Sequence, residues 1–125
     1  MKKIKELKGA FHLPVEFGVL VPSTTKANKR ISAKQFKKRT DMVRTYLSSK
    51  FGGYTSVVGV GGYMSDTKGL IKEDVSMVVS YSQESDFKKY KSEVIKKVKS
   101  WGKSWKQEAM GVIVENDLYY VNSKR

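Results

Sequence analysis

The chain has 125 residues and no cysteine, so disulfides, thiolate metal sites and a cysteine nucleophile are all excluded. His12 is the single histidine, which also excludes Cys/His zinc sites and most histidine-based catalytic triads. Lysine and arginine total 25 against 12 acidic residues, a formal net charge of +13 that would attract phosphate-rich partners through salt-sensitive fields.

This length fits one domain with one modest core, so we predict a single domain over residues 1–125, with residues 1–13 as a basic N-terminal segment. Charged residues interrupt every apolar run, and no stretch has the pattern of a signal peptide or a membrane span. We therefore expect a cytoplasmic protein that does not contact a membrane.

The first two elements are expected to be a strand and a helix. Residues 15–21 alternate at period two, with Val15, Phe17, Val19 and Val21 on one side, which indicates a half-buried strand. In residues 32–51, Ser32 and Gln35 have the spacing of a capping box. This segment is predicted to be a helix ended by Gly52 and Gly53, and its apolar stripe comprises Phe36, Thr40, Val43, Leu47 and Phe51.

The second half of the chain repeats this alternation of strands and a helix. Residues 54–63 and 71–82 predict a hairpin closed by the turn residues 64–69. A second helix is expected to be capped by Ser85 or Asp86, with Trp105 covering its end. Residues 108–115 predict a fourth strand, and residues 118–121 a short return. The apolar stripe of the second helix comprises Phe87, Tyr90, Val94, Val98 and Trp101.

The order β-α-β-β-α-β is typical of α+β domains of the ferredoxin-like class, a four-stranded antiparallel sheet with two helices on one face. Right-handed crossovers would put the first and third strands in the middle and the second and fourth at the edges. The uncovered sheet face is expected to carry Glu16, Gly18, Ser76 and Ser80. It would either be wet or be covered by a second copy in a homodimer.

Three stretches, FGGYT (51–55), GVGGYMSDTKGLIKEDVSMVVSY (59–81) and QEAMGVIV (107–114), resemble a family of small proteins catalogued only as a domain of unknown function. The resemblance extends over residues 15–121 and rests most on Glu73 and the pair Gln107 and Glu108. Tyr63 stands where that family usually has tryptophan. The resemblance implies a ferredoxin-like fold and brings no activity or catalytic residues with it.

The glycines of VVGVGGYMSD (57–66) suggest a phosphate-binding loop at first sight. A nucleotide fingerprint needs its glycines between a strand and a helix, however, and these glycines precede a hairpin. We therefore interpret them as positions of special strand geometry, overhanging an edge of the sheet.

Two carboxylates are predicted at that same edge. Glu73 and Glu108 would flank the first strand, roughly 10 Å apart at the backbone. Alternation places Glu73 in phase with Val75 and Glu108 in phase with Met110, which turns both toward the helix-covered side. The pair could hold a divalent cation or act as acid and base with help from Gln107. The alternative, which we favour, is that each carboxylate accepts hydrogen bonds from backbone amides of the neighbouring loop and helix.

The absence of a catalytic motif favours a binding module over an enzyme, and we predict no cofactor and no metal. The leading hypothesis is that a lysine-rich surface binds an anionic partner, either nucleic acid or a nucleotide-type ligand. The alternatives are a small enzyme or metal site at Glu73 and Glu108, and a mobile-element accessory protein that binds a host protein; the lysines could also serve only solubility. The predicted ligand-binding residues are Lys34, Lys37, Lys38, Arg39, Arg44, Lys96, Lys97, Lys99 and Lys103.

Overall fold

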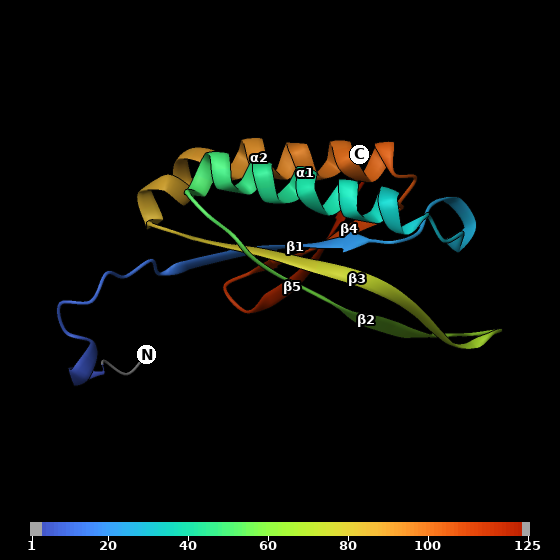
Figure 1. Ribbon diagram of the computed structural model, residues 1–125, viewed down its shortest axis with the longest axis horizontal. Helices are drawn as coiled ribbons and strands as arrows, with labels where there is room; N and C mark the ends of the chain where they lie inside the picture. The colour runs from blue at the N-terminus through green and yellow to red at the C-terminus, as the bar shows by residue number, and fades with distance from the viewer. Residues whose placement is uncertain (1–3, 124–125) are drawn as a thin grey trace.

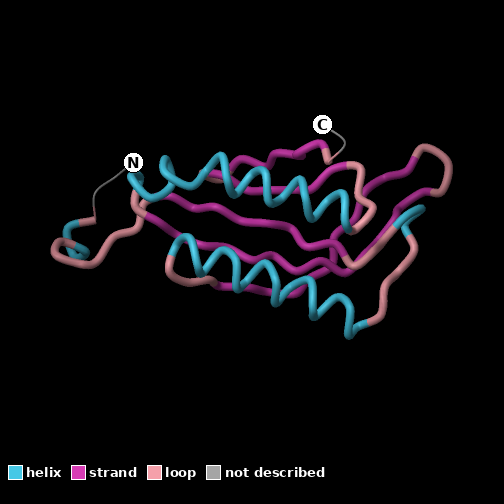
Figure 2. The backbone as a smooth tube through the Cα atoms, turned by 90° about the horizontal axis from the view of Figure 1, so that it is seen from above, coloured by secondary structure: helices cyan, strands magenta, loops and turns pink. Residues whose placement is uncertain are grey.

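The computed structural model describes residues 4–123 as two layers, an antiparallel sheet with both α-helices packed on one face (Figure 1). Seen from above, the two helices lie side by side over the strands (Figure 2). The strands run in the order β2-β3-β1-β4-β5. The elements are the short 3-10 turn η1 (Lys5–Leu7), β1 (Val15–Pro22), the 3-10 turn η2 (Lys26–Asn28), α1 (Ala33–Phe51), β2 (Thr55–Ser65), β3 (Gly69–Ser82), α2 (Glu84–Ser104), β4 (Ala109–Val114) and β5 (Asp117–Asn122).

The α+β architecture and the central positions of β1 and β3 are as predicted, but the sheet has five strands and not four. The expected short return is a full strand, β5, which pairs with β4 along its whole length. Glu115 and Asn116 connect the two strands with φ angles of 53° and 73°. Positive φ at both central residues is the geometry that closes a two-residue hairpin. The prediction that the fourth strand is an edge strand is therefore wrong, because β4 lies between β1 and β5.

The capping-box prediction for α1 is confirmed. Ser32 Oγ accepts from the Gln35 amide at 3.1 Å, and Gln35 Oε1 accepts from the Ser32 amide at 3.3 Å. Gly52 ends the helix with a φ of +94°, in the left-handed region where a residue without Cβ is favoured.

The predicted cap of α2 is wrong, because the helix begins at Glu84 and Gln83 occupies the cap position. The Gln83 side chain makes no capping bond and instead donates to the carbonyl of His12 at 3.1 Å. Glu84 and Asp86 lie in the first turn, where negative charge is stabilised by the helix dipole.

The core fills the space between the helices and one face of the sheet. Its β1 side chains are those of the predicted alternation, and the predicted stripes of both helices meet them. Trp101 and Trp105 are both buried and stack with ring centroids 5.7 Å apart, so Trp105 covers the end of α2 as expected. The buried core comprises Phe17, Val19, Val21, Val43, Leu47, Val78, Val94, Val98, Trp101, Trp105, Met110 and Val112.

The predicted facing of β3 is reversed. Ser76, Val78 and Ser80 point toward the helices and are buried, whereas the alternate residues, including Val75 and Glu73, lie on the uncovered face. The buried serines have partners: Thr40 Oγ1 donates to Ser76 Oγ at 2.9 Å and Ser80 Oγ donates to the Gly53 carbonyl at 2.6 Å. Buried hydroxyl groups are tolerated in a core when they are hydrogen-bonded. The side of β3 that carries the serines can therefore be the buried side.

We call the sheet face away from the helices the open face. Glu16 and Gly18 lie on it as predicted, since Gly18 is paired with Val79 and Glu16 with Tyr81. Tyr81 donates its hydroxyl proton to Glu16 Oε2 at 3.3 Å. Neither α-helix in residues 4–123 has the length and apolar character that crossing a membrane requires.

Candidate functional site

A cavity of about 440 Å³ lies on the open face, at the end of the sheet where β1 finishes and β4 begins. We call it the open-face pocket. All five strands contribute to it, and β5 supplies Tyr120. It is lined by Leu20, Pro22, Gly61, Gly62, Tyr63, Glu73, Val75, Gln107, Ala109, Met110, Gly111 and Tyr120.

Glu73 is the one carboxylate among the described residues that line this pocket. It is half-buried on β3, and its Oε2 accepts from Thr24 Oγ1 at 3.1 Å. The prediction that Glu73 leans toward the helices is wrong, because the facing of β3 is reversed. Its carboxylate accepts from a side-chain hydroxyl and remains available to a ligand in the pocket.

Gln107 lines the same pocket and fixes the loop that follows β1. Its Nε2 donates to the Thr24 carbonyl at 2.8 Å and to the Trp105 carbonyl at 3.1 Å. The side chain therefore ties the end of α2 to this loop and holds Thr24 beside Glu73. Gln107 is a positioning residue of the pocket wall.

Arg39, predicted to bind a ligand, belongs to this supporting structure and is only 8% exposed. Its Nη1 donates to the carbonyls of Pro22 and Thr24, both at 2.8 Å, and its guanidinium lies 5.0 Å from the centre of the Trp105 ring. Burial lowers the pKa of Arg39, although a guanidinium stays charged at neutral pH. Arg39 holds the loop after β1 from the helix side.

Glu108 and Glu73 flank β1 as predicted, but they do not form a pair. Glu108 precedes β4, is exposed and does not line the pocket, and its backbone carbonyl accepts from the Ser123 amide at 3.0 Å. Within residues 4–123, no three acidic or histidine side chains lie close enough to hold a metal ion together.

Three pocket residues were not predicted from the sequence: Tyr63, Tyr120 and Gly111. Gly111 pairs with Tyr120, and a Cβ on Gly111 would lie 3.0 Å from Leu20 Cδ1, so glycine lets the neighbouring side chain pack closely. Tyr63 follows the glycine run of β2, and its hydroxyl accepts from Asn28 Nδ2 at 3.3 Å. Recognising β5 as a strand would have placed Tyr120 on this face.

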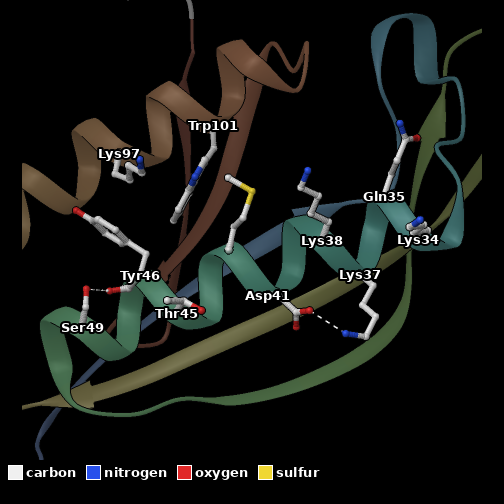
Figure 3. A pocket seen from close by; sticks show the side chains of 11 residues that line it. Lys34, Gln35, Lys37, Lys38, Asp41, Thr45, Tyr46, Ser49, Lys97 and Trp101 are labelled. Atoms are coloured by element: carbon white, nitrogen blue, oxygen red, sulfur yellow. Dashed lines mark hydrogen bonds and ion pairs between the residues drawn. The ribbon is translucent and has the colours of Figure 1, made fainter.

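The predicted basic surface divides into separate regions. Lys34, Lys37, Lys38 and Lys97 line a groove between α1 and α2 (Figure 3). Arg44 is occupied within the fold: it pairs with Asp41 at 3.0 Å, donates to Ser56 Oγ at 2.9 Å and lies over the Tyr54 ring. The remaining predicted residues, Lys96, Lys99 and Lys103, lie together on the outer face of α2.

The fold is similar to two solved structures of a phage SAM lyase, one in complex with S-methyl-5'-thioadenosine and one in the apo state. Both align with a TM-score of 0.60, at 18% and 17% sequence identity. The alignments cover 88% and 89% of this chain and 90% of each neighbour. These likenesses establish a shared architecture.

No protein-family model and no curated protein matches the sequence. The resemblance to a domain of unknown function and the ferredoxin-like class therefore stay predictions.

Proposed function

We propose that the open-face pocket binds an adenosyl sulfonium compound of the S-adenosylmethionine type, and that the protein cleaves this compound as a lyase. The observation that carries the proposal is a pocket holding one carboxylate, Glu73, and two tyrosines, in a fold similar to that of a phage SAM lyase.

The contents of the pocket suit such a ligand. Its volume of about 440 Å³ lies in the range of small-molecule sites, which are mainly apolar with a few placed polar groups. Tyr63 and Tyr120 supply aromatic surface, which attracts a sulfonium cation and stacks on a base. Glu73 is the acceptor for hydroxyl or ammonium donors of the ligand. Gln107 keeps Thr24 in place beside it.

The chemistry needs little from the protein. When the bond between the sulfonium sulfur and the γ-carbon of the amino acid portion breaks, the bond electrons go to sulfur and leave a neutral thioether, S-methyl-5'-thioadenosine. The substrate's own carboxylate oxygen forms a bond to that carbon and closes a lactone, so the atoms balance without water. A neutral leaving group needs no proton, which agrees with a chain that has one histidine and no cysteine.

Calorimetric titration with S-adenosylmethionine and with S-methyl-5'-thioadenosine tests binding, and chromatography with mass detection tests conversion of the first into the second. Glu73→Gln should weaken binding at least about tenfold, as expected for loss of a charge-assisted hydrogen bond. Glu16→Gln is the matched control, because it makes the same change near the other end of the open face. Absence of binding, or equal effects of the two variants, would contradict the proposal.

Of the two alternatives that the sequence leaves open for the open face, solvent or a second copy, we also propose the second copy. Val57, Leu118 and Tyr120 are 55%, 51% and 70% exposed on that face, and exposed apolar patches often mark association surfaces. Light scattering after gel filtration should give a mass above that of one chain, and Leu118→Glu should reduce it. A monomer at all concentrations would contradict this part of the proposal.

Nucleic-acid binding is the second candidate function, favoured by Lys96, Lys99 and Lys103 lying side by side on α2, without an ion-pair partner among the described residues. Titration with duplex and single-stranded DNA at two salt concentrations tests it, since phosphate contacts release counterions. Binding that is lost in the triple Lys→Ala variant at low salt supports this candidate. No binding at low salt contradicts it.

A further inference from the structure

A cavity larger than the open-face pocket lies away from it, between the two helices on the opposite side of the molecule. Figure 3 shows the side chains that line this open groove. Its volume is about 960 Å³. We call it the interhelical groove. Most of its lining comes from α1, and Lys97 and Trp101 come from α2. Its lining includes Lys34, Lys38, Met42, Tyr46, Lys97 and Trp101.

The middle of the groove is apolar. Met42 lies in the middle of α1, away from both helix ends, and its side chain is 43% exposed in the groove. The rings of Tyr46 and Trp101 meet edge to face with centroids 5.4 Å apart, and Trp101 reaches from α2 toward α1 (Figure 3). The groove therefore offers Met42 and the half-buried Tyr46 ring to an apolar side chain, above a floor formed by the buried Trp101.

Positive charge surrounds this apolar strip. Lys34 and Lys38 are exposed on α1, and Lys97 lies 5.7 Å from the Tyr46 ring centre. The single acidic residue of the described lining, Asp41, is already paired with Lys37 at 2.8 Å and with Arg44 at 3.0 Å. The lysine hydrogen bond lowers the pKa of Asp41, which stays ionised and engaged. The other lysines have no carboxylate partner among the described residues and are available to an incoming anion.

The length of the groove indicates an elongated occupant. Its lining on α1 extends from Lys34 to Ser49, which corresponds to roughly 22 Å at 1.5 Å per residue. A peptide helix of about four turns has the same length. A small metabolite would fill only part of it.

Charge limits the identity of the occupant. A second copy docked through the same groove would meet these lysines with its own. The arginines of α1 are used inside the fold, so the bidentate geometry that favours phosphate is missing here. Lysines are point charges that pair readily with carboxylates, and the exposed methionine suits aliphatic side chains better than a sugar-phosphate backbone.

We propose that the interhelical groove is a docking site for an acidic amphipathic helix of a partner protein. Apolar side chains of that helix, spaced three and four residues apart, contact Met42 and Tyr46, and the buried Trp101 supports the Tyr46 ring. Aspartate and glutamate side chains on its flanks pair with Lys34, Lys38 and Lys97. This is recognition of a helix in a groove, with electrostatic steering by the lysines. The inference is independent of the proposed lyase activity.

The test uses a fluorescein-labelled synthetic peptide of about 16 residues, with leucines at three- and four-residue spacing and glutamate at the other positions. Fluorescence anisotropy measures its binding to the whole protein. The comparison probes are the same peptide with lysine in place of glutamate and a single-stranded oligonucleotide of about 16 nucleotides. Saturable binding of the acidic peptide, weakened by salt and absent with the lysine peptide, is the expected result.

Three variants locate the binding. Met42→Glu should weaken it at least about tenfold and Lys38→Glu about fivefold, whereas Lys103→Glu should change it less than about twofold. Lys103→Glu is the matched control, because it makes the same charge change on the outer face of α2. Circular dichroism checks folding, which exposed helix positions changed to glutamate should preserve.

Several outcomes would overturn the inference: no saturable binding at low salt, equal losses in Lys38→Glu and Lys103→Glu, or equal binding of the lysine peptide. Binding of the oligonucleotide in this groove in preference to the acidic peptide would assign the site to nucleic acid instead.

Discussion

The sequence predicts Arg39 on a binding surface, but the fold places it in the interior. This difference leads to a quantitative prediction for the free energy of unfolding. Replacing Arg39 by alanine removes donors to the carbonyls of Pro22 and Thr24, each at 2.8 Å. The Thr24 carbonyl keeps a donor from Gln107. The Pro22 carbonyl loses its arginine donor, so the cost is dominated by this one bond.

A hydrogen bond to a charged group contributes about 1.5–3 kcal/mol to stability, and the cation–π contact with Trp105 adds about 0.5–1 kcal/mol. Arg39→Ala should therefore lower the free energy of unfolding by about 2–4 kcal/mol. Urea denaturation followed by circular dichroism measures this value by linear extrapolation.

Arg30→Ala is the matched control, since its side chain is 69% exposed and pairs with Asp74 at 3.5 Å. A surface pair of this kind contributes less than about 1 kcal/mol. Equal stability losses in Arg39→Ala and Arg30→Ala would refute the reasoning. So would an Arg39→Ala protein of normal stability that has lost affinity for an anion, because that is the behaviour of a binding residue.

The remaining predictions concern the cap, the core and the pH dependence of α1. Ser32→Ala should lower the free energy of unfolding by about 1 kcal/mol, because the capping bond to Gln35 is lost. The control Ser100→Ala, at an exposed position of α2, should leave the free energy of unfolding almost unchanged. Equal losses of the two variants in urea denaturation would contradict the capping role. Leu47→Ala empties a fully buried position and should cost about 2–5 kcal/mol by the same measurement, whereas a loss no larger than that of the partly exposed Met42→Ala would show that the site is not tightly packed. Lys37 lowers the pKa of Asp41 below its ordinary value of 3.8, so the stabilisation is present above that value and is lost as pH falls through it toward the lower pKa of the folded state. Between about pH 6 and about pH 3, Asp41→Asn should lose less stability than the native protein, and an identical loss in both would rule out this contribution.

Local signals in the sequence predicted the elements well. The capping box at Ser32, the glycine stop at Gly52 and the alternation of β1 all describe short-range geometry that a few neighbouring residues determine. The start of α2 was misplaced because Ser85 and Asp86 are good caps by type. The chain instead uses Gln83, whose side chain bonds to the distant His12 carbonyl.

The candidate site was predicted in part. The edge of the sheet, Glu73 and Gln107 were identified from topology, and the open-face pocket lies there. Glu108 was placed with them because strand order brings it near, but position along a strand does not specify where a side chain points. Tyr120 was missed because a strand that follows a two-residue turn looked like a short return.

The hydrophobic period of each segment and the order of the segments along the chain are properties of the sequence itself. They determine the helices and strands, the apolar stripes of α1 and α2 that meet in the core, and the strands that neighbour β1. Which phase of β3 is buried is decided only in three dimensions. Both phases of that strand contain valine, and the choice depends on Thr40 and Gly53 supplying partners for Ser76 and Ser80. The same holds for charge, since the sequence specifies a surplus of lysine and arginine. Tertiary packing decides that Arg39 is buried and hydrogen-bonded within the fold, whereas Lys34 and Lys38 remain exposed beside an apolar groove.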